Sequence, residues 1–120
     1  MKNIQTLYLT LKQPWFNLML TGEKTKEYRD PNKWIISRLF WQQNLYFSKK
    51  FDKIRFTNGY GIHRPWFEVE FLGVNKAILK ETLHYTTGHT LELYGDFLVI
   101  RFGKVLDSGN LEVLSNRIND

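Results

Sequence analysis

Lys24, Glu27 and Arg29 are the residues whose types and spacing are best suited to chemistry in this sequence. Side chains alternate between the two faces of an extended strand, so a strand over 24–30 places Glu27 and Arg29 on one face and Lys24 on the other. A lysine close to a carboxylate and a guanidinium can hold an anionic or amide-bearing ligand, and a lysine–glutamate pair can move protons. The residues alone leave a second reading open, in which Glu27 and Arg29 form a structural ion pair that fixes the strand.

A second candidate group lies just before this strand, at the start of a helix predicted over 14–21. Pro14 is favoured at the first helical position, and Gly22 is a suitable residue to end the helix. Gln13 can donate to and accept from the edge of a base, while the helix N-terminus attracts an anion. Trp15 is either part of the core or a platform on which a base stacks.

A third candidate group surrounds a glycine turn later in the chain. Asn58, Tyr60, His63 and Arg64 place amide, aromatic and basic side chains in one short loop that ends at Trp66. Base stacking combined with phosphate contact requires this mixture of side chains. An ordinary hairpin loop, with Trp66 packed inside the fold, is the alternative reading.

The motifs that connect the first two groups resemble a known family. The run Q-P-W at 13–15, an apolar turn, and G-x-K-T-x-E-x-R at 22–29 are similar to the signature of the ASCH domain family, a branch of the PUA-like superfamily of small β-barrels. The run F-T-N-G-Y-G at 56–61 and the predicted strands at 66–74 and 97–106 resemble the remaining strands of compact bacterial or phage members. The resemblance implies that the segment 22–29 lines a central cleft.

From this resemblance we expect a module that binds RNA, a nucleotide or a modified nucleoside in a polar cleft. Lys24 and Arg29 would contact a phosphate or a carbonyl, and Glu27 would accept a hydrogen bond from an exocyclic amine or orient Lys24. The predicted ligand-binding residues come from all three groups and are Gln13, Trp15, Lys24, Glu27, Arg29, Asn58, Tyr60, His63 and Arg64.

Two other functions remain open at this stage. Some small bacterial members of the family are amidohydrolases that act on N4-acetylcytidine with a lysine, a threonine and a glutamate. The lysine corresponds to Lys24, but the threonine position holds Glu27, and either Glu68 or Glu70 would supply the distal glutamate. Lys24 and Glu27 are then the candidate catalytic residues, and they would activate a water molecule in place of a hydroxyl nucleophile. The other alternative is a protein-interaction or regulatory module without catalysis.

Composition limits the class of protein. The 120 residues predict one domain over 1–120 with enough hydrophobic residues, 42%, to form a core. The net charge of +5 is uneven, because residues 1–66 hold twelve Lys or Arg against four Asp or Glu, whereas residues 67–120 hold five against eight. This asymmetry indicates either a basic face that meets phosphates or a solvated lysine-rich surface.

Several classes of site are not expected. The chain contains no cysteine, which excludes disulfides and thiolate chemistry. Its three histidines, at 63, 84 and 89, do not have the spacing of metal ligands, so we expect neither a metal nor a cofactor. No apolar run approaches the length of a membrane span, and we expect a cytoplasmic protein that does not bind membranes. The sequence leaves the oligomeric state open.

Both strands and helices are predicted to position these groups. Periodicity predicts strands at 6–12, 24–30, 53–57, 66–74 and 97–106, with helices at 14–21 and after the Asp30-Pro31-Asn32 start signal. The segment 41–50 is left unassigned, and 77–84 within the weakly patterned 76–90 is read as one or two helical turns. The tail 107–120 is expected to hold at most one edge strand, at 111–114, before it frays. Together with the resemblance, these elements predict an α+β fold, a small PUA-like β-barrel of five to six strands covered by two or more short helices.

Overall fold

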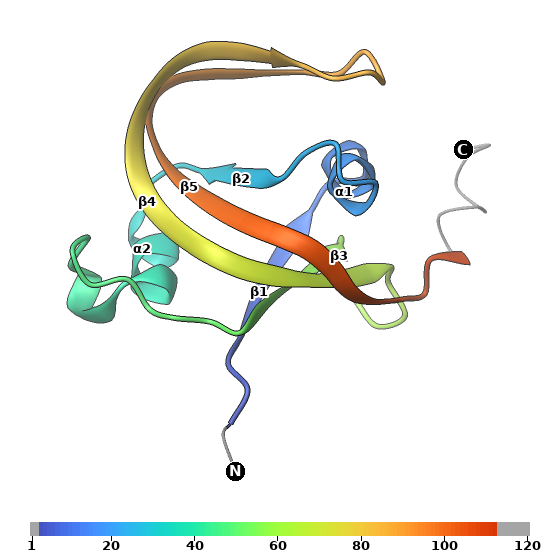
Figure 1. Ribbon diagram of the computed structural model, residues 1–120, viewed down its shortest axis with the longest axis horizontal. Helices are drawn as coiled ribbons and strands as arrows, with labels where there is room; N and C mark the ends of the chain where they lie inside the picture. Colours follow the sequence, from blue (N-terminus) through green and yellow to red (C-terminus); the bar gives the residue numbers. More distant parts are fainter. Residues whose placement is uncertain (1–2, 113–120) are drawn as a thin grey trace. The chain divides into compact units, whose positions relative to one another are not determined.

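The computed structural model describes residues 3–112 and shows an α+β fold with a five-stranded mixed sheet. The strand order is β1-β3-β4-β5-β2, so β1 and β2 are the outer strands, and no pairing between them closes the sheet among the described residues. The α+β prediction is confirmed. The elements, shown in Figure 1, are β1 (Thr6–Leu11), α1 (Gln13–Leu20), β2 (Lys26–Arg29), α2 (Lys33–Leu39), a 3₁₀ turn (Trp41–Gln43), β3 (Lys53–Asn58), β4 (Trp66–His84) and β5 (Thr90–Gly109).

The described residues fall into two compact units, and the long strands β4 and β5 run through both. The first unit takes in residues 3–25, 51–71 and 102–112, and the second takes in 26–50 and 72–101. The expectation that residues 1–120 act as one domain stays a prediction. No helix among residues 3–112 has the length and apolar character needed to cross a bilayer.

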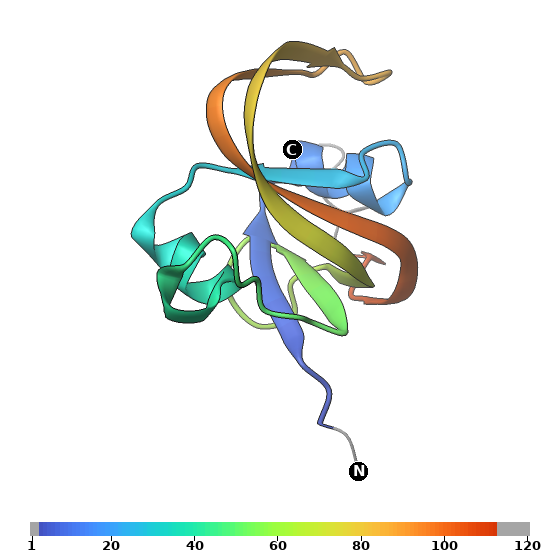
Figure 2. The ribbon, with the colours of Figure 1, turned by 60° about the vertical axis from the view of Figure 1, so that its left-hand side comes forward.

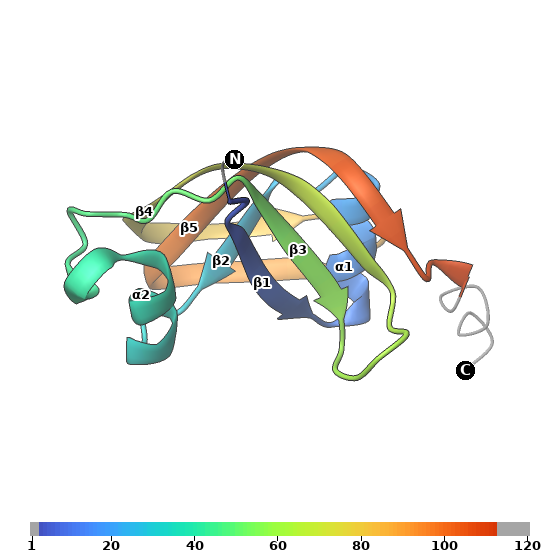
Figure 3. The same ribbon diagram turned by 90° about the horizontal axis from the view of Figure 1, so that it is seen from below.

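In the first unit, β1 and β3 lie side by side and run parallel, from the pair Thr6 and Lys53 to the pair Leu11 and Asn58 (Figure 3). The predicted alternation in β1 is confirmed, because its three leucines are buried while Tyr8 is exposed. The ring of Phe67 on β4 meets Phe16 of α1 edge-on, with 4.8 Å between ring centroids. The apolar stripe of α1 therefore packs on the sheet as its sequence spacing predicts.

In the second unit, β2 pairs antiparallel with β5, so that Glu27 lies opposite Ile100. Helix α2 begins where the sequence signal places it, because the side chain of Asn32 accepts a hydrogen bond from the backbone N–H of Ile35 at 3.0 Å. Ile35 and Leu39 are the buried residues of this helix.

The predicted helical turn at 77–84 is wrong. Strand β4 continues to His84, and its second half pairs with the first half of β5 as a long hairpin (Figure 1). Near its tip, the backbone N–H of Tyr85 donates to the carbonyl of His89 at 3.0 Å. The segment Lys76-Ala77-Ile78-Leu79-Lys80 contains good helix formers, but cross-strand pairing outweighs this weak local propensity.

The C-terminal predictions need two corrections. Asp107 belongs to β5, which extends to Gly109, and not to a separate tail. Leu111 and Glu112 are not in a strand, and the remainder of the edge strand predicted at 111–114 lies outside the described residues.

Candidate functional site

A cavity of about 460 Å³ opens in the first unit, where the carboxyl ends of β1 and β3 meet. The start of α1 and the loop between β3 and β4 complete its wall. Its lining residues are Thr10, Leu11, Lys12, Gln13, Asn58, Gly59, Tyr60 and Arg64.

Local backbone geometry explains why this cavity forms here. The parallel register of β1 and β3 sets Leu11 beside Asn58, so both strands end at the same edge. Gly59 then turns the chain with a φ of 80°, a left-handed conformation that glycine adopts without strain. Its N–H donates to the carbonyl of Leu11 at 3.2 Å, and the N–H of Asn58 donates to that of Pro65 at 2.9 Å. These bonds fix the loop against the end of β1.

Asn58 is the most unusual lining residue. It lies on the same face of β3 as the buried Ile54 and Phe56, and its own exposure is 3%. The side-chain amide nitrogen is buried without a hydrogen-bond acceptor among the described residues. An unsatisfied buried donor costs about 1–3 kcal/mol, so this amide would gain free energy from any acceptor brought within reach of its nitrogen.

Arg64 contributes positive charge to the wall, as does Lys12. Its Nε donates to the backbone carbonyl of Asn58 at 2.8 Å. The guanidinium lies over Gly59, where an added Cβ would be 3.5 Å from Nε. The two terminal amino groups of this guanidinium donate no hydrogen bond within residues 3–112, which leaves them for an anionic ligand.

Gln13 and Tyr60 supply an amide and an aromatic ring at the same place. Gln13 is the first residue of α1, and its side chain makes no hydrogen bond to the described part of the chain. The Tyr60 ring is 86% exposed, and its hydroxyl accepts a hydrogen bond from Thr10 Oγ1 at 3.3 Å. None of the eight lining residues is acidic. Such a wall suits a flat ligand with carbonyl or phosphate oxygens.

The structure thus brings together Gln13 from the second predicted group and Asn58, Tyr60 and Arg64 from the third. Trp15 and His63 do not line this cavity. Trp15 is half-buried on α1, and His63 is exposed in the loop with a left-handed φ of 62°. Lys12 also lines the cavity but was not predicted as a ligand-binding residue. Its position directly before the start of the helix is the sequence feature that could have indicated it.

The residues of the first predicted group do not line the cavity either. Lys24 belongs to the first unit and is buried, with 3% exposure. The prediction that Lys24 lies in a strand is wrong. Its backbone N–H donates to the carbonyl of Leu18 at 3.0 Å and closes the turn after α1. β2 therefore starts two residues later than expected, at Lys26.

Glu27 and Arg29 lie in the second unit and pair with each other on one face of β2. Arg29 Nε donates to Glu27 Oε2 at 3.0 Å, and Glu27 Oε1 accepts from the backbone N–H of Tyr28 at 3.1 Å. The ion pair that the sequence left open as an alternative is present. The pKa of the Tyr28 hydroxyl is raised by burial and by the nearby carboxylates of Glu81 and Glu27. A common cleft formed by Lys24, Glu27 and Arg29 stays a prediction.

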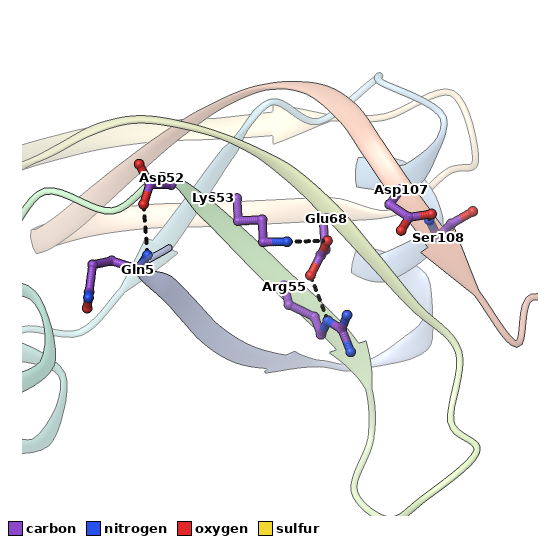
Figure 4. Close-up of polar contacts among 7 residues, drawn as sticks. All are labelled: Gln5, Asp52, Lys53, Arg55, Glu68, Asp107 and Ser108. Carbon is purple, nitrogen blue, oxygen red and sulfur yellow. Dashed lines mark hydrogen bonds and ion pairs between the residues drawn. The ribbon is translucent and has the colours of Figure 1, made fainter. Parts of the chain in front are cut away.

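Glu68 is the centre of an ion-pair network that the sequence did not reveal. Lys53 Nζ and Arg55 Nε approach its two carboxylate oxygens at 2.8 and 2.9 Å (Figure 4). Burial alone would raise the pKa of Glu68, but the hydrogen bonds and charges of Lys53 and Arg55 lower it below its ordinary value. The Arg55 guanidinium also lies 3.8 Å from the centroid of the Trp66 ring. Glu68 therefore has a structural role in the pairing of β3 with β4.

Glu70, the other candidate for the distal glutamate, is also engaged. Its Oε1 accepts a hydrogen bond from the backbone N–H of Lys104 at 3.1 Å. It shares a face of β4 with Glu68, opposite the buried Phe67 and Val69, because side chains alternate along the strand. No group of three or more His, Asp or Glu side chains suited to a metal ion occurs within residues 3–112.

Comparisons of the chain with protein-family models, with curated proteins and with solved structures found no match.

Proposed function

We propose that this protein binds a nucleotide, free or as part of RNA, or a modified nucleoside, in the cavity between the ends of β1 and β3. The observation that carries the proposal is Asn58, a lining residue of that cavity whose side-chain amide nitrogen is buried without a hydrogen-bond acceptor among residues 3–112. The cavity volume of about 460 Å³ falls within the range of roughly 300–1,000 Å³ that is usual for small-molecule sites.

Five of the lining residues have a role in this proposal. Asn58 donates a hydrogen bond to a carbonyl oxygen of the base, which satisfies its buried amide. Gln13 pairs with the base edge, and the Tyr60 ring stacks on the base face. Arg64 and the exposed Lys12 neutralise the phosphate, with help from the N-terminus of α1.

The proposal includes membership of the ASCH type within the PUA-like superfamily. It is supported by the Q-P-W and G-x-K-T-x-E-x-R motifs, and by a helix that follows β1 directly and borders the cavity. A PUA-like barrel built on the five-stranded sheet is the finer architecture that we propose, and the absence of cysteine fits a cytoplasmic location.

Isothermal titration calorimetry with uridine, UMP, CMP and AMP tests the proposal. We expect at least one of these ligands to bind, and we expect Asn58→Leu to weaken its binding more than tenfold without lowering the unfolding midpoint, since the leucine removes an unsatisfied polar group. The matched control is Thr57→Val, which removes a polar group from the next position on the opposite face of β3. Equal affinity in wild type and Asn58→Leu, or no binding of any of the four ligands, would overturn the proposal.

The burial of Lys24 favours a second candidate function, the hydrolysis of N4-acylated cytidine derivatives. A lysine held inside the protein is a suitable acid–base group, and water would attack the amide carbonyl to release the carboxylic acid and cytidine. Glu27, in the second unit, is already engaged, because Arg29 and the Tyr28 N–H contact its two carboxylate oxygens. Incubation with N4-acetylcytidine should then release cytidine, and Lys24→Met should abolish the release. Undiminished turnover in Lys24→Met, or none in wild type, would remove this candidate.

A further inference from the structure

In the second unit, five large apolar side chains, four of them aromatic, are exposed to solvent within fourteen positions of the chain. Patches of large exposed apolar side chains on small proteins commonly mark an interaction surface. We call this group the aromatic surface. Its members and their exposures are Trp34 (57%), Trp41 (61%), Leu45 (38%), Tyr46 (92%) and Phe47 (62%).

The loop that carries most of this surface has a fixed backbone. The backbone N–H of Trp41 donates to the carbonyl of Phe47 at 2.8 Å, and the N–H of Lys49 donates to the carbonyl of Leu39 at 2.7 Å. Figure 2 shows the loop folding back beside α2. Gln42 and Gln43 adopt left-handed conformations, with φ of 52° and 55°, which non-glycine residues seldom do. The rings are therefore exposed because the backbone holds them there.

Cations lie directly over two of the rings. The Arg38 guanidinium is 5.3 Å from the centroid of Trp34, and Lys49 Nζ is 4.9 Å from that of Trp41. Lys49 Nζ also donates to the carbonyl of Ser37 at 3.0 Å, which connects the loop to α2. Between Asp30 and Asp52 the chain has no acidic residue, but it has four basic ones at 33, 38, 49 and 50. Among its charged side chains, the segment that carries the aromatic surface thus contributes only positively charged ones.

We propose that the aromatic surface binds a single-stranded nucleic acid. Bases stack on the exposed rings of Trp34, Trp41 and Tyr46, while Arg38, Lys49 and Lys50 contact the phosphates. Single-stranded nucleic acids are recognised by this combination of stacking platforms and cations. The site is separate from the cavity of the first unit, and the inference does not depend on the function proposed for that cavity.

An anionic membrane is the other partner that aromatic and basic side chains can meet, and the structure argues against it. Gln42 and Gln43 lie between Trp41 and Leu45, are exposed, and their side-chain amides form no hydrogen bond within residues 3–112. Insertion of the neighbouring rings into lipid would strip these amides of water without providing a partner, which is unfavourable. The edges of unpaired bases can donate to and accept from the same amides.

Fluorescence anisotropy with a labelled twelve-nucleotide oligouridylate tests this inference. We expect Tyr46→Ala and Trp41→Ala each to weaken binding roughly five- to a hundredfold, the effect of losing one base stack. Tyr46 is almost fully exposed, so its replacement tests the inference even if Trp41→Ala does not fold. The matched control is Tyr94→Ala, which removes a ring of 58% exposure elsewhere in the second unit and should leave affinity unchanged.

Two further arms separate the alternatives. Oligothymidylate of equal length should also bind, because stacking and phosphate contact do not require a 2′-hydroxyl. If a mononucleotide binds the cavity, its affinity should be equal in Tyr46→Ala and wild type, which separates the two sites. Unchanged oligonucleotide affinity in Tyr46→Ala would overturn the inference. So would wild-type binding to phosphatidylserine vesicles without binding to either oligonucleotide.

Discussion

The cavity of the first unit and the aromatic surface of the second unit contain similar side chains in opposite environments. In the cavity, amide and basic groups lie around Asn58, whose side-chain amide nitrogen is buried and has no acceptor among residues 3–112. On the aromatic surface, rings that would normally be buried are exposed beside cations. In our proposals the first arrangement would select a ligand by hydrogen bonding, whereas the second would hold any stacked base. Among residues 3–112, a buried polar group without a partner and a cluster of exposed rings are both departures from ordinary packing, and each supports the binding site that we propose there.

The largest contrast is expected in stability. Phe56 is fully buried between Phe67 and Phe102, so Phe56→Ala should lower the free energy of unfolding by about 3–5 kcal/mol. Phe47→Ala, on the aromatic surface, should change it by less than about 0.5 kcal/mol. Urea unfolding of the two variants measures both effects. A cost for Phe47→Ala close to that for Phe56→Ala would show that Phe47 supports the fold and is not an open platform.

The next contrast replaces one arginine in each region by glutamine. Arg64→Gln should weaken binding of a mononucleotide roughly ten- to a hundredfold, because a hydrogen bond to a charged group contributes about 1.5–3 kcal/mol. Arg38→Gln should leave mononucleotide affinity unchanged but weaken oligonucleotide binding. Calorimetry and anisotropy on the same two proteins provide the comparison. If both variants lose both activities equally, the two regions are not separate sites.

A smaller effect is expected in the salt dependence of oligonucleotide binding. Each phosphate contact to a single strand contributes about 0.7 to the slope of log K against log salt concentration. Lys50→Gln should therefore reduce the slope by about 0.7, whereas Lys104→Gln, an exposed lysine of the first unit, should leave it unchanged. Anisotropy titrations between 50 and 300 mM salt (about a sixfold range) measure the slope. An equal slope in wild type and Lys50→Gln would remove Lys50 from the phosphate contacts.

The smallest effect concerns the network around Glu68, which belongs to neither site. Its carboxyl pKa is lower in the folded protein than its ordinary value of 4.5, so its contribution to stability is present above that value and is lost as the pH falls through the folded pKa. The unfolding free energy of wild type should consequently fall more steeply below about pH 4.5 than that of Glu68→Gln. Urea unfolding at a series of pH values measures this difference. Parallel pH profiles would show that the pairs with Lys53 and Arg55 add no pH-dependent stability.

Much of the fold follows from local sequence patterns. The alternating leucines of β1, the Pro14 start of α1 and the Asn32 cap of α2 all lie where periodicity and capping chemistry place them. The helical prediction for the second half of β4 is wrong because residues such as Ala77 and Leu79 have a local preference for helix. This preference does not show the strand with which they pair. Long-range pairing is the part of a fold that local propensity does not contain.

The candidate sites, too, could be predicted only as far as their residues are close together in the sequence. Asn58, Tyr60 and Arg64 were predicted together because a glycine turn keeps them close in sequence, but their meeting with Gln13 depends on the parallel pairing of β1 with β3. Lys24 was assigned to a strand on alternation alone, and the turn that its N–H closes onto Leu18 removes it from that pattern. The aromatic surface has no periodicity to reveal it, because the exposed rings of 41–47 lie in an irregular loop.

The Asn58 side-chain amide provides the most direct test of the proposed nucleotide site. Its two N–H signals can be followed in nitrogen-15-labelled protein by NMR while the nucleotide that binds most tightly by calorimetry is added, and Asn58→Leu assigns them by their absence. We predict that at least one of these signals moves downfield and saturates with the calorimetric affinity, because the buried donor gains an acceptor. Amide signals that stay in place while the nucleotide saturates the protein would contradict the claim that this cavity is its binding site.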